Sequence, residues 1–194
     1  IFGDSKGGLS QWFMARDSDG ELRFKHIRSF QMGTSPIVEI TAEQRRKGFL
    51  ALDAAGEIGV FHSTAHRTLL VEKVAEGPGI MALSPRANRI IVEEGGKLLP
   101  LFLKNPHPEV SWSALWSKVW YENYDAPKYV WQSTAANTDF EPKMSRAPLT
   151  FGTLKAAFYA MLLAAPLAVA AAIYTAYFKA PTLRRKLKPL IQLM

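Results

Sequence analysis

Short apolar runs, each bounded by polar or turn-forming residues, dominate the chain up to about residue 115. The clearest runs occupy residues 36–40, 48–52, 57–62, 68–71, 79–84 and 89–92. Runs of this length between turn residues favour strands, because helices need longer segments with a period of 3.6. The pattern therefore predicts a mainly β region built from several short strands.

Three stretches of this region resemble one another. Residues 16–24, 52–61 and 92–102 each contain an apolar strand, a turn that ends in glycine, and a second strand. The turn glycines are Gly20, Gly56 and Gly96. They are 36 and 40 residues apart, which is close to the ~40–45 residues of a four-stranded propeller blade. The repeats predict WD40-like, β-propeller-type blades, although the Trp-Asp dipeptide of true WD40 repeats is absent.

About three such units fit into residues 1–115, whereas a closed propeller needs about four to eight blades. We therefore expect residues 1–115 to form an incomplete set of propeller-like blades, with the chain starting partway round the ring. The alternative is a small antiparallel meander whose repeat spacing is coincidental.

Aromatic residues concentrate in the segment that follows, and residues 116–148 are predicted to form an aromatic and polar connector next to a membrane. Trp112, Trp116 and Trp120 recur at every fourth position, which suits one face of a helix. Two interpretations remain open. The aromatic side chains either lie at the level of the lipid headgroups or pack against the last blade or a connecting helix.

Residues 149–178 have the composition of a transmembrane helix. Lys155 is the only charged residue in this range, and residues 156–178 form an uncharged run. A bilayer core of ~30 Å needs about 20 such residues at a rise of 1.5 Å each. We therefore predict that this segment spans a membrane.

Small residues recur at every fourth position of the predicted span. They are Gly152, Ala156, Ala160, Ala164, Ala168, Ala172 and Ala176. Because lipid supplies no hydrophobic force between helices, small residues that allow close approach mark helix contacts. This row, the small-residue stripe, is predicted to pack against other membrane helices. The alternative is that an alanine-rich helix produces such a row by chance.

The flank after the span gives the orientation. Residues 179–194 carry five basic side chains and no acidic one, which leaves +2 of the formal net charge of +7 for the rest of the chain. Basic flanks stay in the cytoplasm, so this flank is predicted to be cytoplasmic and residues 1–148 to lie outside the cytoplasm. A charge that is local to one tail does not indicate a nucleic-acid-binding surface.

The sequence contains no convincing catalytic constellation. It has no cysteine, which excludes disulfides and thiol catalysis, and it has no P-loop motif for ATP. His62 and His66 have a spacing that occurs in zinc sites, but no third ligand lies near them in sequence. We therefore expect a protein that is not an enzyme and that holds no metal or cofactor.

Around the start of the span the sequence resembles one family. The resemblance rests on Phe-Glu-Pro-Lys-Met-Ser at 140–145, Pro-Leu-Thr-Phe-Gly-Thr-Leu at 148–154, Ala-Pro-Leu-Ala-Val-Ala-Ala-Ala-Ile-Tyr at 165–174 and Leu-Lys-Pro-Leu-Ile at 187–191. These motifs are similar to the start of the permease core of phosphate ABC transporters, in the PstC-type subunit. Ala168 stands where that family commonly has glycine. The resemblance covers about residues 121–194.

The resemblance implies a function and a set of partners. The chain would be a fragment of a multi-pass permease subunit of the bacterial inner membrane that imports inorganic phosphate, with residues 1–148 in the periplasm. Its partners would be a second permease subunit, an ATP-binding subunit, a periplasmic phosphate-binding protein and membrane lipid. No residue of the phosphate pathway can be transferred to this chain. The alternative function is a membrane-anchored sensor or scaffold with a propeller-type binding head.

Overall fold

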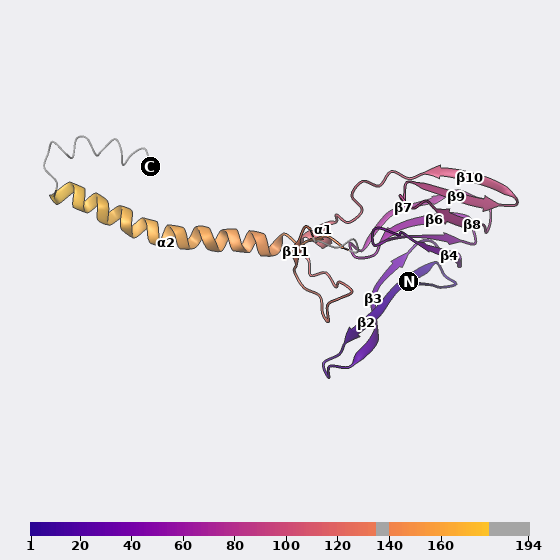
Figure 1. Ribbon diagram of the computed structural model, residues 1–194, viewed down its shortest axis with the longest axis horizontal. Coiled ribbons are helices and arrows are strands. Elements are labelled where there is room, and N and C mark those ends of the chain that lie inside the picture. The colour runs from indigo at the N-terminus through magenta and orange to yellow at the C-terminus, as the bar shows by residue number, and fades with distance from the viewer. Residues whose placement is uncertain (135–139, 179–194) are drawn as a thin grey trace. The chain divides into compact units, whose positions relative to one another are not determined.

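The computed structural model describes residues 1–134 and 140–178. The chain divides into two compact units, residues 1–148 and 149–194. The first unit is mainly β, and a long helix follows it (Figure 1). This confirms the prediction of a mainly β region followed by one apolar helix.

Antiparallel strands in the described residues form three successive sheets and one short ribbon, and none of the sheets closes on itself. Sheet 1 contains β1 (Phe2–Gly3), β2 (Gly8–Arg16) and β3 (Leu22–Gln31). Sheet 2 contains β4 (Ile37–Ala42), β5 (Gly48–Asp53), β6 (Glu57–His62) and β7 (Arg67–Lys73). Sheet 3 contains β8 (Ile80–Leu83), β9 (Arg89–Glu94) and β10 (Lys97–Phe102). The ribbon pairs β11 (Trp131–Gln132) with β12 (Lys143–Met144).

The three turn glycines lie where the sequence predicted them. Each stands between two paired strands, and their φ angles are +79° for Gly20, +82° for Gly56 and +81° for Gly96. This left-handed conformation is accessible to glycine at little cost. In the central hairpin, Asp53 Oδ1 also accepts hydrogen bonds of 2.9 Å from the backbone N–H groups of Ala55 and Glu57. The side chain of Asp53, the first residue of the Asp-Ala-Ala-Gly sequence, therefore stabilises the β5–β6 turn.

The β5–β6 and β9–β10 turns allow a matched test of glycine. A Cβ atom on Gly56 would clash with the carbonyl oxygen of Ala75, whereas one on Gly96 would meet nothing within 4 Å. Gly96→Ala should therefore cost only the left-handed strain of about 1–2 kcal/mol. Gly56→Ala should cost more, because the β7–β8 connection must also move. Urea unfolding of both variants measures the difference, and equal losses of stability would contradict it.

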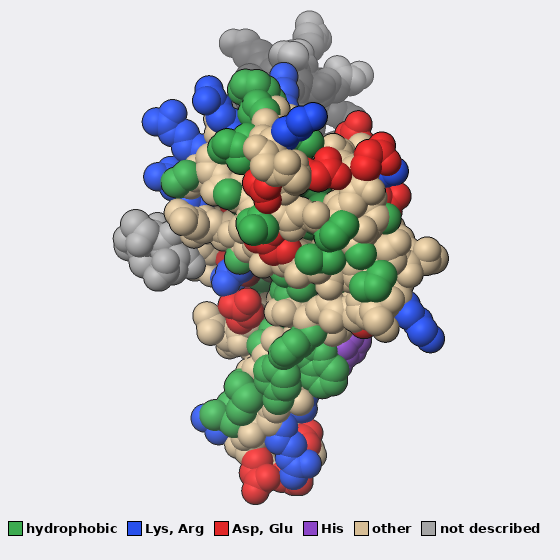
Figure 2. Space-filling view, turned by 90° about the vertical axis from the view of Figure 1, so that its right-hand side faces the viewer, with side chains coloured by type: hydrophobic (Ala, Val, Ile, Leu, Met, Phe, Trp, Pro, Cys, Tyr) green, Lys and Arg blue, Asp and Glu red, His purple; other side chains and the backbone are tan. Residues whose placement is uncertain are grey.

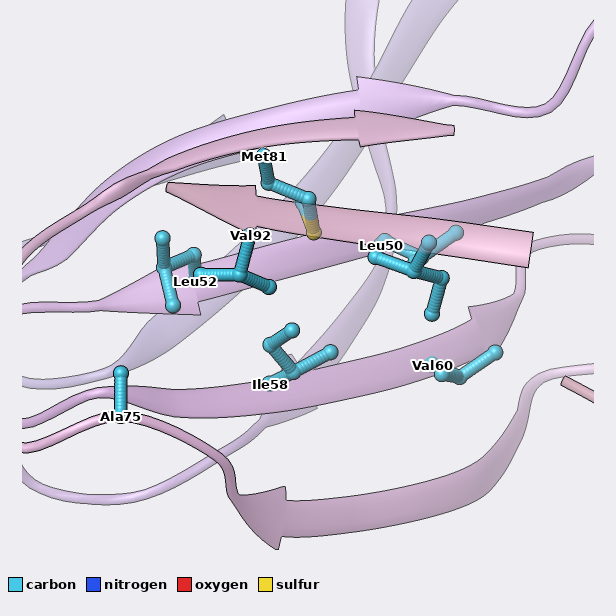
Figure 3. Packing of buried hydrophobic residues seen from close by; sticks show 8 residues of the cluster. Leu50, Leu52, Ile58, Val60, Ala75, Met81 and Val92 are labelled. Carbon is cyan, nitrogen blue, oxygen red and sulfur yellow. The ribbon is translucent and has the colours of Figure 1, made fainter. Parts of the chain in front are cut away.

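Sheet 2 is covered on both faces, because side chains that alternate along β5 enter two different clusters. Phe49 and Ala51 pack with Leu9 and Phe30 of sheet 1. Leu50 and Leu52 point the opposite way and pack against sheet 3, where Met81 and Val92 meet them (Figure 3). All six residues of β5 are buried as a result. The three sheets therefore form a stack in the order 1, 2, 3.

The β2–β3 hairpin is the longest in the structure, and part of it extends away from the other sheets (Figure 1). Its pairing shifts between Gln11 and Trp12, which leaves Ile27 as an extra residue on β3. Such a bulge bends a strand and increases its twist. Beyond the bulge, Met14 lies opposite Phe24.

The aromatic connector does not form the helix that the tryptophan spacing suggested. Helix α1 (Trp112–Trp116) has only five residues, begins after the N-cap Ser111 and ends at Ser117. Trp120 lies beyond it, and its ring meets Phe13 edge-on at 6.0 Å. The interpretation of one helical face over residues 112–120 is therefore wrong, because Trp120 packs on a strand distant in sequence.

Candidate functional site

Helix α2 (Ala147–Phe178) is the first candidate functional feature. In the described part of the chain it alone is long and apolar enough to cross a membrane. None of its residues is buried, and its hydrophobicity is spread evenly around the axis. A helix that is apolar on every side belongs in a protein core or in a membrane. The predicted span of 149–178 thus falls within one continuous helix.

Two threonine hydroxyl groups of α2 form hydrogen bonds within the helix. Thr153 Oγ1 donates a 2.9 Å hydrogen bond to the carbonyl oxygen of Leu149, and Thr175 Oγ1 donates one of 2.7 Å to that of Ala171. Such back-bonds allow hydroxyl groups in an apolar environment, where unpaired polar groups are costly. Pro166 lies inside the helix and lacks the N–H group that would bond one turn back.

Helix geometry limits how many members of the small-residue stripe can contact one partner helix. Each step of four residues rotates about 40° around a helix with 3.6 residues per turn. The seven members from Gly152 to Ala176 therefore wind round more than half of α2 and do not lie on one face. Only three or so neighbours, such as Ala160, Ala164 and Ala168, can meet a single partner helix. Packing of this stripe stays a prediction.

Two of the predicted features fall outside the described residues. They are the basic flank at 179–194 and the motif at 187–191. The orientation drawn from that flank therefore stays a prediction.

A pocket in the first unit is the second candidate feature. Its volume is about 710 Å³, which is in the range of small-molecule sites. Sequence positions far apart line it, from β2, the β4–β5 turn, the end of β6 and segments near residues 107, 122 and 141. No local motif marks such a site, and sequence reasoning missed it.

Ion pairs neutralise much of the charge around this pocket. Arg46 Nε contacts Glu43 Oε1, and Lys47 Nζ lies 2.8 Å from Glu122 Oε2. Arg46 Nη1 also donates to the carbonyl oxygen of Asn105. The described lining includes four glutamates against three Lys or Arg side chains. The pocket thus does not offer the excess of cationic donors that suits a phosphate ion.

Burial shifts the pKa of two titratable groups in the pocket lining toward the uncharged form. The Nδ1 atom of His62 accepts a 3.1 Å hydrogen bond from the N–H of Ala65, which places the proton on Nε2. Burial lowers the pKa of His62 to about 4, so that the ring is neutral at pH 7. Burial also raises the pKa of Glu141, although the hydrogen bond with the Thr64 side chain lowers it. Glu141 Oε1 has no hydrogen-bond partner among the described residues.

Arg28 lies next to the pocket lining and hydrogen-bonds to one of its residues, Gln11. Its Nη1 donates a 2.7 Å hydrogen bond to Gln11 Oε1, and its Nη2 donates to the carbonyl oxygen of Trp120. Burial lowers the pKa of the guanidinium, while Glu141 raises it. Arg28 therefore links β2, β3 and the connector, and it positions Gln11 at the edge of the pocket.

His62 and His66, the two histidines with zinc-like spacing, make hydrogen bonds to different parts of the chain. His66 Nε2 donates to the carbonyl oxygen of Ser29 at 2.9 Å, and its ring meets Phe30 edge-on. His62 points its Nδ1 at Ala65 as described above. Among the described residues no group of three His, Cys, Asp or Glu side chains is arranged to hold a metal ion.

Comparison with known proteins does not assign the chain to a family. No protein-family description matches it, and no curated protein matches it significantly.

Proposed function

We propose that this chain is part of an inner-membrane permease subunit of an ABC importer for inorganic phosphate. The observation that carries the proposal is helix α2, a continuous helix with Lys155 as its one charged residue, whose sequence contains the family-like motifs at 148–154 and 165–174. In this proposal α2 opens the permease core and contributes to the transmembrane pathway. ATP hydrolysis belongs to a separate ATP-binding subunit, and a second permease subunit completes the pathway.

The proposal includes a role for the first unit. Residues 1–148 lie in the periplasm, on the side from which a phosphate-binding protein delivers its ligand. The three stacked sheets correspond to successive propeller-type blades, and the repeat spacing together with the doubly covered sheet 2 supports this. A reporter that is active only in the periplasm, placed between Gly95 and Gly96, should be active. An inactive reporter in a protein that has reached the membrane would contradict the periplasmic location of residues 1–148.

Phosphate uptake tests the transport function. In a strain that lacks the gene for the whole protein, uptake should fall, and a plasmid copy should restore it. Plasmid copies with Ala164→Leu or Ala168→Leu should restore it only partly, because overpacking a helix contact costs about 1–3 kcal/mol. Leu162→Ala, which lies about 160° around the helix from Ala164, is the matched control.

Protein level in the membrane must be measured beside uptake. Normal uptake in the deletion strain would overturn the transport proposal itself. Normal uptake with both stripe variants, at wild-type protein level, would overturn only the packing role of the stripe.

A membrane-anchored sensor or scaffold is the second candidate, and the pocket is the observation that favours it. Neutral His62 and the cations that are paired within the lining, such as Lys47 with Glu122, suit an uncharged polar ligand better than phosphate. A deletion strain with unchanged uptake and an altered cellular response would favour this candidate.

A further inference from the structure

The aromatic residues of the connector differ in exposure. Trp120 is half-buried and Tyr121 is buried, and both belong to the packing of the first unit. Four others are exposed and are called the exposed aromatics below. They are Trp112, Trp116, Tyr129 and Trp131, with exposed fractions of 81%, 44%, 45% and 41%.

The exposed aromatics point away from a small core. Ala114 belongs to this core, together with Val119 and Tyr121, and Val130 packs against it. Ala114 lies about 160° around α1 from both tryptophans of that helix, because each residue turns a helix by about 100°. Val130 lies between Tyr129 and Trp131 in a segment that pairs at both ends. Successive side chains of such an extended segment point to opposite sides, so that both aromatic pairs face outward.

Backbone hydrogen bonds connect the exposed aromatics to the residues just before α2. The N–H of Arg146 donates to the carbonyl oxygen of Leu115 at 2.7 Å. The N–H of Ser145 donates to the carbonyl oxygen of Val130 at 3.0 Å. Each of these two carbonyl groups lies one residue before an exposed tryptophan, and α2 begins at Ala147. The exposed aromatics therefore lie close to the point at which the chain enters the predicted span, and the number of blades does not alter this.

Basic side chains accompany the exposed aromatics. Lys118 Nζ lies 5.9 Å from the ring centroid of Tyr129, and Lys128 and Arg146 are exposed. Within residues 1–134 and 140–178, none of these three cations forms an ion pair with a carboxylate. Tryptophan and tyrosine rings collect at the level of the lipid headgroups, and long basic side chains reach the lipid phosphates. The composition of this surface therefore matches that layer of a bilayer.

The β2–β3 hairpin offers a comparison surface. Figure 2 shows hydrophobic side chains gathered along this projecting hairpin, with charged side chains at its tip. Trp12 on the hairpin is 37% exposed, which is close to the value for Trp131. In the described part of the chain, no backbone hydrogen bond connects the hairpin to residues 143–147. Exposure of a tryptophan alone therefore does not place it near the span, whereas the bonds of Ser145 and Arg146 do.

We propose that the exposed aromatics, with Lys118, Lys128 and Arg146, bind the headgroup layer of the bilayer beside the point where α2 enters it. The rings lie among the headgroups and the cations contact lipid phosphates. This contact holds the connector against the membrane and limits how the first unit can turn about its junction with the span. The inference rests on α2 as a membrane span and does not depend on the transport of phosphate.

The absence of cysteine allows a direct test with single nitroxide labels. The full chain is placed in vesicles of phosphatidylcholine and phosphatidylglycerol, with one label at Trp112→Cys or at Trp131→Cys. Each substitution leaves three of the four exposed aromatics in place. Trp12→Cys is the matched control on the hairpin, and Leu162→Cys reports the span itself.

The accessibility of each label is measured for oxygen, which concentrates in lipid, and for a nickel chelate, which stays in water. Their ratio cancels the local crowding around a label, so that it separates contact with lipid from burial in protein.

The oxygen-to-nickel ratio at Trp112→Cys and at Trp131→Cys should be about fivefold higher than at Trp12→Cys, which corresponds to about 1 kcal/mol. The ratio at Leu162→Cys should be higher still, because this position lies within the apolar helix. Adding Trp116→Ser to the Trp131→Cys chain should lower the ratio at the label, since one contact with the headgroups is lost. Adding Trp12→Ser to the same chain should leave it unchanged.

Three results would overturn the proposal. Equal ratios at positions 12, 112 and 131, with a lipid-like value at 162, would show that α2 spans the membrane without help from the exposed aromatics. Low accessibility to both reagents at 112 and 131 would show that protein covers these positions. A water-like value at 162 would remove the span and the headgroup contact together, which separates that failure from the first.

Discussion

Replacing Phe61 by alanine is expected to lower the free energy of unfolding of the first unit by about 3–5 kcal/mol. The Phe61 side chain is fully buried. Its ring stacks on Phe49 at 5.1 Å and meets Phe30 at 5.5 Å, so that it joins sheet 1 to sheet 2. Truncation would leave a cavity between two sheets that the surrounding strands cannot close without moving.

Urea unfolding in detergent, followed by tryptophan fluorescence, measures this loss, because all five tryptophans precede the span. Phe61→Leu is the matched control and should cost less, since it keeps most of the apolar volume. If the alanine and leucine variants unfold at the same urea concentration, the ring does not hold the two sheets together.

Replacing Leu167 by arginine should impair membrane insertion of α2. Leu167 lies in the middle of the apolar run, where a translocon-inserted arginine costs of the order of 3 kcal/mol. Tyr177→Arg near the end of the helix should cost much less, because the long side chain can reach the interface. The measurement is the fraction of protein that resists alkaline extraction from membranes.

Equal retention of both arginine variants, at the wild-type level, would show that Leu167 does not lie at the centre of a bilayer. Loss of both to the same extent would place Tyr177 inside the apolar layer as well. The difference between the two positions is therefore the informative quantity, since it reports depth.

The local elements of the β region could be read from the sequence because their determinants are local. Strand β6 coincides with the predicted run at 57–62, and the turn glycines carry the positive φ that tight hairpins need. The sequence also predicts strand β5, as an unbroken apolar run. Apolar and polar residues do not alternate along it because both of its faces are covered.

Features that depend on distant contacts could not be read in the same way. The spacing of Trp112, Trp116 and Trp120 suggested a helix, but the ring of Trp120 is held by Phe13, more than 100 residues earlier. The pocket joins residues from separate strands and turns, so its lining has no signature in any one segment. The bent register at Gln11 and Trp12 likewise depends on pairing with β3.

The order of strands within the stack has a consequence for how the chain folds. Sheets 1, 2 and 3 each pair strands that are consecutive in sequence, and none borrows a strand from another sheet. Chains rich in such local pairings fold faster than those that must first close long loops. Each sheet can therefore form as soon as its own segment has been synthesised. Each newly formed sheet then offers an apolar face on which the next sheet can pack.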